Sequence, residues 1–237
     1  MTRLSVNINK IATLRNSRGG KVPSVKEATI RCQEFGAQGI TVHPRPDERH
    51  ITRHDVYEIK PLIYTEFNIE GYPNVDFLKM VAEIKPHQVT LVPDSHDQLT
   101  SDHGWDTWKH MSFLKEVIAR LQENGIRTSI FVDPDVAAME GAAEAKADRI
   151  ELYAEPYAGL YPVERHKAIE PFVEAAKAAQ KLGIGVNAGH DLSLENLNYL
   201  YKNIPNLEEV SIGHALIADA LYLGLETTIR KYLDCLK

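Results

Sequence analysis

Short runs rich in β-branched and aliphatic residues alternate along the chain with longer stretches whose apolar residues recur at helical spacing. The short runs are typical of buried strands, and the longer stretches are typical of amphipathic helices. The sequence predicts eight strands, over residues 4–9, 39–43, 65–70, 88–93, 127–132, 149–154, 185–189 and 209–214.

Amphipathic stretches fill the intervals between these strands. In one of them the apolar positions recur every three or four residues, at Phe172, Val173, Ala176, Ala179 and Leu182. Several stretches end in a glycine just before the next strand, where a left-handed cap residue is expected (Gly36, Gly125 and Gly183). We expect helices over 25–36, 54–63, 74–85, 111–125, 135–146, 170–183, 194–204 and 215–236.

Eight strand–helix units in 237 residues predict a (β/α)8 barrel that occupies residues 1–237 as a single domain. Strands that alternate with helices pair in parallel through right-handed crossovers. A doubly wound open sheet is the alternative, but no GxGxxG motif follows the first strand to support it.

Composition and charge exclude several classes of protein. The net charge of −6 argues against binding to nucleic acid or to an acidic membrane, since both need a basic surface. The two cysteines are too few for a disulfide scaffold or a thiolate metal site. The sequence shows neither a signal peptide nor an apolar run long enough to span a membrane, so we expect a cytoplasmic protein.

The connection after the fourth predicted strand, residues 94–110, is unusually long and polar. Such a connection can close over a site as a mobile lid, or it can be a surface excursion with no such role.

Polar and titratable residues stand at the ends of six predicted strands, where barrel enzymes carry their chemistry. Because these ends meet at one mouth of the barrel, we expect the side chains to form an active site. They are Asn7, Asn9, Lys10, His43, Arg45, Glu70, Glu151, Asn187, His190, Gly213 and His214.

Imidazoles and carboxylates together suit general acid–base catalysis near neutral pH. They could equally bind a divalent metal ion, although the histidines stand singly on different strands, without an HxH or HExxH pair. We expect no metal.

Three segments could bind phosphate groups. Residues 13–24 combine Arg15, Arg18 and Lys21 with the pair Gly19-Gly20, a combination that suits an anion cradle or a solvated loop. Gly213 precedes a predicted helix whose free amides would point at an anion. The segment 43–50 adds Arg45, Arg49 and His50. Separate anion sites predict two phosphorylated substrates or one bisphosphate.

The segments NINKIATLRNSRGG, HPRPDERHI, NIEG, NAGHDLS and SIGHALI, in this order and spacing, resemble those of the pyridoxine 5′-phosphate synthase family. The resemblance runs from about Val6 to the last helix. It implies a barrel with short extra helices that assembles as a homo-octamer. It also implies the condensation of 3-amino-1-hydroxyacetone 1-phosphate with 1-deoxy-D-xylulose 5-phosphate, without a metal or organic cofactor.

The resemblance also implies roles for individual residues. His43 and Glu70 would be general bases, His190 the general acid, and Glu151 would stabilise charged intermediates. The groups that would hold the aminoacetone phosphate are Asn7, Arg18, Gly213 and His214. Those that would hold the deoxyxylulose phosphate are Arg45, His50 and Thr100, the last within the long connection.

Three positions depart from the usual family pattern. Asn9 and Lys10 stand where many members have Asp-His, at a position that contacts deoxyxylulose phosphate, and Asp191 stands where many have Gly beside a phosphate. Two other functions therefore stay open. One is a metal-dependent sugar-phosphate isomerase or aldolase, and the other is a barrel that binds phosphometabolites without catalysis.

Overall fold

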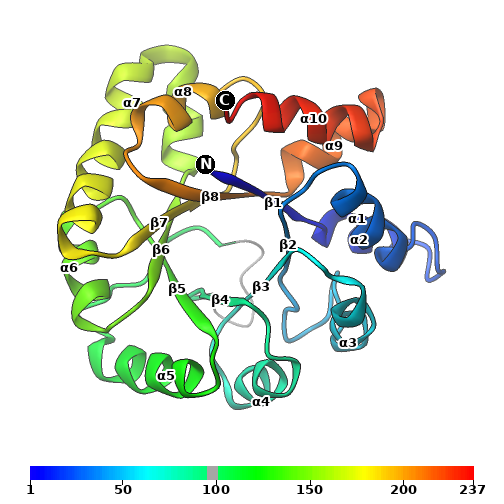
Figure 1. Cartoon of the computed structure of the whole chain (residues 1–237), viewed down its shortest axis with the longest axis horizontal. Helices are drawn as coiled ribbons and strands as arrows, with labels where there is room; N and C mark the ends of the chain where they lie inside the picture. The colour runs from blue at the N-terminus through cyan, green and yellow to red at the C-terminus, as the bar shows by residue number, and fades with distance from the viewer. Residues whose placement is uncertain (95–100) are drawn as a thin grey trace.

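The computed structural model describes residues 1–94 and 101–237, and its strands close into a barrel (Figure 1). Each strand pairs in parallel with its sequence neighbours, and β1 pairs with β8 from Arg3–Glu209 to Val6–Ile212. The predicted (β/α)8 barrel is confirmed, and the open sheet is excluded by the β1–β8 ladder. The strands are β1 (Arg3–Asn7), β2 (Gly39–Val42), β3 (Glu66–Gly71), β4 (Gln88–Leu91), β5 (Arg127–Val132), β6 (Arg149–Tyr153), β7 (Gly185–Gly189) and β8 (Leu207–Ile212).

The helices surround this barrel as a ring (Figure 1). They are α1 (Asn9–Asn16), α2 (Val25–Glu34), α3 (Arg53–Ile59), the 3-10 helix η1 (Lys60–Leu62), α4 (Val75–Ile84), α5 (Met111–Glu123), α6 (Val136–Glu144), α7 (Glu155–Leu182), α8 (Leu197–Asn203), α9 (His214–Leu223) and α10 (Leu225–Asp234). Side-chain caps fix several starts. The Thr52 hydroxyl, for example, accepts a hydrogen bond from the Asp55 amide, and the Asp55 carboxylate accepts one from the Thr52 amide, a capping box.

Three sequence expectations about helices are wrong in detail. The predicted first strand extends to Asn9, but α1 already begins there, so Asn9 and Lys10 are helical. The helix predicted over 170–183 begins at Glu155 and is kinked at Glu164, where φ is −141°. The final helix breaks into α9 and α10 at Gly224, whose φ of 79° suits a residue without a side chain.

The main hydrophobic core lies between the strands and the helices. Alternate strand residues such as Leu4, Val6, Phe67 and Ile69 are fully buried in this layer. The residues between them point into the barrel, where their side chains contact those of strands that are not neighbours in the sheet. Thr90 on β4 donates to Glu151 on β6 (3.4 Å).

The barrel interior is therefore polar at its base and middle, where many barrels hold branched apolar side chains. Its inward-facing polar residues include Arg3, Ser5, Thr41, Glu66, Asn68, Gln88, Thr90, Arg127, Arg149, Glu151, Asn187 and Glu209. Such an interior can hold buried carboxylates close to the mouth, and this positions the site.

Candidate active site

Glu70 lies at the centre of the side chains that the sequence placed at strand ends. Its carboxylate accepts hydrogen bonds from the Asn7 amide of β1 (3.4 Å) and the Ser211 hydroxyl of β8 (3.4 Å). Nδ1 of His43, the residue after β2, lies 3.7 Å from Glu70 Oε2. Contacts from β1, β2 and β8 therefore meet on one carboxylate of β3, as expected from strand ends of a closed barrel.

Burial shifts the pKa values of His43 and Glu70 in opposite directions. Loss of solvation, followed by the charge of Arg45, holds the pKa of His43 well below its usual range. Loss of solvation raises the pKa of Glu70 to about 7, against the opposing charge of His190. At neutral pH His43 is an uncharged acceptor, and Glu70 can either hold or release a proton, which is the property of a general base.

The pKa of Glu151, in the interior of β6, is shifted in the same direction as that of Glu70. Burial, together with the charges of Glu70 and Glu209, raises its pKa well above the usual range. The backbone of β7 closes over it, since a Cβ built on Gly189 would lie 2.1 Å from Glu151 Oε1. The raised pKa favours the protonated form of Glu151, which can donate a hydrogen bond or a proton.

His190 and Asp191 follow β7 with a rarely used backbone. Their φ angles are 71° and 52°, in the left-handed region that costs an L-residue of order 1–3 kcal/mol. The Asn196 side chain helps to hold this turn by donating to the Asp191 carbonyl (3.1 Å). The turn places the His190 ring against Phe131 and Tyr153, with ring centroids 5.7 and 5.5 Å away.

Asp191 faces its neighbour as well as solvent. Its carboxylate Oδ2 lies 3.8 Å from His190 Nδ1. The nearby His190 side chain, together with the charge of His214, lowers the pKa of Asp191. Asp191 is thus an anion beside His190.

The two departures at the start of α1 have different surroundings. The Asn9 side chain accepts a hydrogen bond from the His43 amide (2.9 Å), so it ties α1 to the end of β2. Lys10 is exposed, and its charge lowers the pKa of His50.

His50 is a buried hydrogen-bond donor. Burial and the charge of Arg45 lower its pKa to about 4, so the ring is neutral at pH 7. Its Nδ1 accepts a hydrogen bond from the Ile51 amide (2.9 Å), which places the ring proton on Nε2. Its ring centroid is 6.3 Å from that of His43. His43 and His50 are thus neighbours in the structure.

Four residues are predicted to hold the aminoacetone phosphate. Of these, Asn7 and Gly213 lie next to each other in the structure. A Cβ built on Gly213 would lie 3.1 Å from the Asn7 Cβ, so only a glycine fits beside Asn7 without movement. Gly213 precedes α9, and His214 is exposed at its first turn. Arg18 follows α1 in an exposed segment and forms no side-chain hydrogen bond or ion pair with the described residues.

The expected anion cradle over residues 13–24 is partly wrong. Its first four residues complete α1, and Arg15 forms an ion pair with Asp55 of α3 and donates to the His50 carbonyl (3.3 Å). Arg15 therefore links α1 to α3 and does not face a ligand. Two contacts of Asn16 with the carbonyls of Arg49 and His50 add to this brace.

Part of the long connection 94–110 is described. Trp105 is buried and donates from its indole to the Leu91 carbonyl (3.1 Å), while Trp108 is half exposed. Thr100 lies outside the described residues.

Asp94, which begins this connection, is not among the site residues predicted from the sequence. Its carboxylate forms a buried ion pair with Arg45 (2.6 Å). The rule that found the other strand-end residues could have found it, since Asp94 follows the fourth predicted strand directly.

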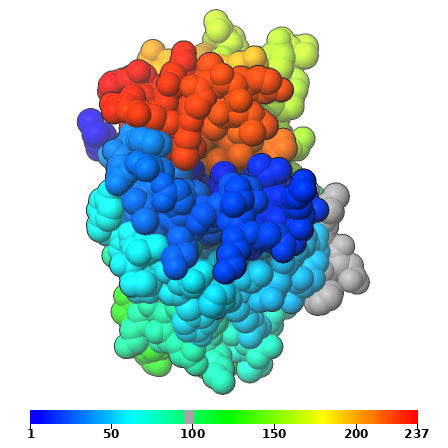
Figure 2. All heavy atoms as spheres, turned by 90° about the vertical axis from the view of Figure 1, so that its right-hand side faces the viewer, coloured from blue at the N-terminus to red at the C-terminus, as the bar shows by residue number. Residues whose placement is uncertain are grey.

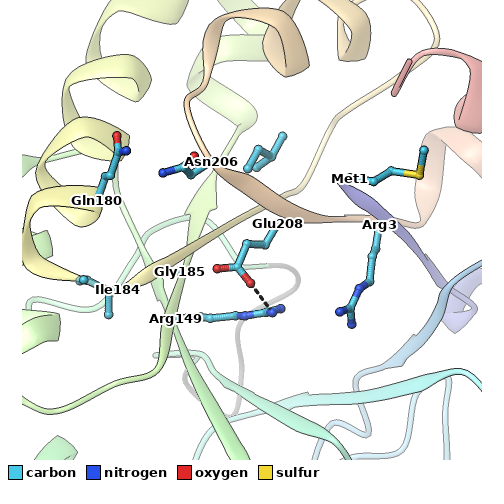
Figure 3. Close-up of a pocket in the computed structure, with 10 residues that line it drawn as sticks. Met1, Arg3, Arg149, Gln180, Ile184, Gly185, Asn206 and Glu208 are labelled. Atoms are coloured by element: carbon cyan, nitrogen blue, oxygen red, sulfur yellow. Dashed lines mark ion pairs between the residues drawn. The ribbon is translucent and has the colours of Figure 1, made fainter.

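A cavity of about 540 Å3 lies at the opposite, amino-terminal end of the barrel (Figure 3). It is lined by the starts of β1, β6, β7 and β8, and Arg149 and Glu208 point toward one another across it as an ion pair. Barrel enzymes use the other end, and none of the predicted site residues lines this cavity. We place the active site at the carboxyl-terminal end.

Two further features concern metals and membranes. Among residues 1–94 and 101–237, no three His, Cys, Asp or Glu side chains gather closely enough to hold a metal ion. No helix in these ranges combines the length and the apolar content needed to cross a bilayer.

The sequence of this chain is similar to those of one family of known proteins. The model of the family described as pyridoxal phosphate biosynthesis protein PdxJ matches residues 4–237. The pyridoxine 5′-phosphate synthase of Bacteroides fragilis strain YCH46 is 65% identical over 237 residues, which is all of both chains. That of Porphyromonas gingivalis strain ATCC 33277 is 58% identical, over 99% of this chain and 98% of its own.

Solved structures share the fold at low identity. Phosphoribosylanthranilate isomerase from Thermotoga maritima aligns with a TM-score of 0.62 at 13% identity, over 100% of this chain and 98% of its own. Tryptophan synthase from M. tuberculosis aligns with a TM-score of 0.66 at 13% identity, over 100% and 94%. At these identities the likeness concerns the barrel alone.

Proposed function

The chain belongs to the pyridoxal phosphate biosynthesis protein PdxJ family and is an enzyme of vitamin B6 biosynthesis, and from this premise we propose its reaction in detail. It condenses 3-amino-1-hydroxyacetone 1-phosphate with 1-deoxy-D-xylulose 5-phosphate. The products are pyridoxine 5′-phosphate, inorganic phosphate and water. The observation that carries the proposal is the buried His43–Glu70 pair at the barrel mouth, with Glu151, whose pKa is also raised by burial, below it.

The chemistry of this condensation needs repeated proton transfers. The amine of one substrate attacks the ketone of the other to give an imine, and proton removal then gives an enamine. Phosphate leaves, and an aldol-type closure followed by loss of water forms the aromatic ring. Glu70 and His43 are suited to remove protons, His190 to return them, and Glu151 to stabilise the charged intermediates.

The two substrates would be held by two sets of groups around these acids and bases. Asn7, Arg18, Gly213 and His214, with the backbone of Asp191, would bind the phosphate of the aminoacetone. Deoxyxylulose phosphate would be bound by Arg45, the Nε2–H of His50, Asn9, Lys10 and Thr100. Holding both substrates side by side supplies much of the rate.

A coupled assay of phosphate release tests this function. We expect phosphate only when both substrates are present, together with a product that has the absorbance of a pyridine ring. Phosphate release from one substrate alone, or tight binding of both without turnover, would contradict the proposal. Loss of turnover in EDTA that is restored by a divalent metal would favour a metal-dependent aldolase.

We also propose that the chain assembles as a homo-octamer. Several apolar residues of the predicted last helix are buried within the chain itself, among them Leu216, Ile217, Ile229 and Tyr232. Leu221 and Tyr222, at the end of α9, are instead 70% and 89% exposed. α9 and α10 lie beside α1 and α2 on one face of the molecule (Figure 2), and a second copy that packs there would cover this patch.

The working compartment we propose is the cytoplasm. Cys32 and Cys235 are both free, and burial raises the pKa of the Cys32 thiol to about 12, which makes it unreactive. Unpaired thiols are usual where the surroundings are reducing.

A further inference from the structure

The side chain of Asp94 acts on two predicted functional groups. It forms an ion pair with Arg45, and its charge influences Glu70. Asp94 follows β4, and its side chain is 3% exposed. Its Oδ2 accepts hydrogen bonds from Arg45 Nη2 (2.6 Å) and from the Ser101 hydroxyl (2.7 Å). Its Oδ1 is buried without a hydrogen-bond partner among the described residues. Asp94 is therefore held by one oxygen.

The ion pair fixes the direction of the Arg45 guanidinium. Both side chains are nearly inaccessible, and a buried charge without its counter-ion is strongly unfavourable, so the two are retained together. The cavity beside them, bounded also by Tyr72 and Phe77, measures only about 20 Å3. That space is too small for a substrate, so a phosphate does not reach the guanidinium through this cavity.

The same pair acts on Glu70. The charge of Asp94 raises the pKa of Glu70, and the charge of Arg45 lowers it, so the two partly cancel. The charged and titratable groups that influence Glu70 come from several strand ends and are His43, Arg45, Asp94, Glu151, His190 and Glu209. Among these groups, Asp94 forms a buried ion pair with Arg45, a predicted ligand of deoxyxylulose phosphate.

We propose that Asp94 is a positioning residue that aims Arg45 at the phosphate of deoxyxylulose phosphate and offsets the charge of Arg45 at Glu70. This inference rests on the proposed function, since Arg45 must meet that substrate. Asp94 itself touches no reacting atom. Its effect passes through Arg45 on binding and through the local charge on proton removal.

The test compares Asp94→Asn with Ser101→Ala, which removes a neutral hydrogen bond from the same oxygen but keeps the ion pair. For Asp94→Asn we expect KM for deoxyxylulose phosphate to rise about 10- to 100-fold, the range for a lost charged hydrogen bond, while KM for the aminoacetone phosphate stays within about twofold. The acid limb of kcat/KM should move to lower pH, because Arg45 then acts on Glu70 without its counter-charge. Ser101→Ala should keep wild-type values of all three.

A second variant guards against misfolding of the first. Asp94→Glu keeps the charge but displaces it by one methylene, so KM for deoxyxylulose phosphate should rise while the acid limb stays in place. Equal increases in both KM values, or an acid limb that does not move in Asp94→Asn, would overturn the role of Asp94. Failure of the proposed function looks different, because then the wild-type enzyme itself releases no phosphate from the two substrates.

Discussion

Nδ1 of His43 and Oε2 of Glu70 lie 3.7 Å apart, and their pKa values are displaced in opposite directions. An exposed pair of this kind would form an ion pair at pH 6. Here burial disfavours both charges, so the proton resides on the carboxyl group and the imidazole stays neutral. The arrangement provides a base of pKa about 7 next to an uncharged proton acceptor.

Replacement of Glu70 by Gln tests the base directly. The amide keeps the shape of the side chain but cannot take a proton, so turnover should fall by roughly 10²–10⁴-fold while substrate binding is largely kept. Phosphate release in the coupled assay measures the loss. Glu140→Gln, at an exposed position of α6, is the control and should behave as wild type. Near-normal turnover of Glu70→Gln would remove this residue from the mechanism.

The wild-type pH profile should carry the same signature. Glu70 must be ionised to act as a base, and its pKa is about 7, so kcat/KM should rise with pH through about 7 and level off above it. The acid limb should be weakened in Glu70→Gln. A profile already flat between pH 5.5 and 8 would contradict a base with this pKa.

Glu151 should lower the stability of the protein at neutral pH. Its pKa is raised on folding, so between the unfolded value of 4.5 and the folded value the native state holds a proton that the unfolded state lacks. Stability from this group is therefore fully present below pH 4.5 and is lost as the pH rises.

Glu151→Gln removes that dependence. We expect its advantage in free energy of unfolding over wild type to widen by about 1.4 kcal/mol for each pH unit between pH 5 and the folded pKa of Glu151. Urea unfolding at equal protomer concentration measures it. A difference between the two proteins that is the same at pH 5 and pH 8 would show that Glu151 is ionised in the folded protein.

Gly189→Ala should impair catalysis through its neighbour. The added Cβ would stand 2.1 Å from Glu151 Oε1, so either the carboxyl group or β7 must shift. We expect turnover to fall at least about 10-fold, since a displacement of 1 Å near the reacting groups is costly. In Gly159→Ala, the control within α7, the new Cβ meets Glu155 Oε1 at an ordinary 3.6 Å. Equal activity of the two variants would contradict the close contact.

The exposed end of α9 should mediate assembly. Light scattering at micromolar concentration should show an oligomer for wild type. Tyr222→Asp should shift it to smaller species, because it places a charge in the patch formed with Leu221. Tyr222→Phe keeps the apolar area and should leave the assembly intact. A monomeric wild-type protein would refute the assembly.

The sequence by itself determined the barrel and much of the site. Eight short runs rich in β-branched and aliphatic residues, separated by amphipathic stretches, predicted where the strands form. Strand ends such as His43, Glu70 and Gly213 were found in the same way, because parallel strands in a closed barrel bring their carboxyl ends together.

Only the tertiary structure decided which charged groups face one another. The pairing of Arg15 with Asp55 removed one expected phosphate ligand, and that of Asp94 with Arg45 added a residue to the site. Both pairs join segments about 40 or more residues apart, and no local periodicity encodes such contacts. The pKa of Glu70 follows from the same cause, because burial and neighbouring charges exist only once the barrel has closed.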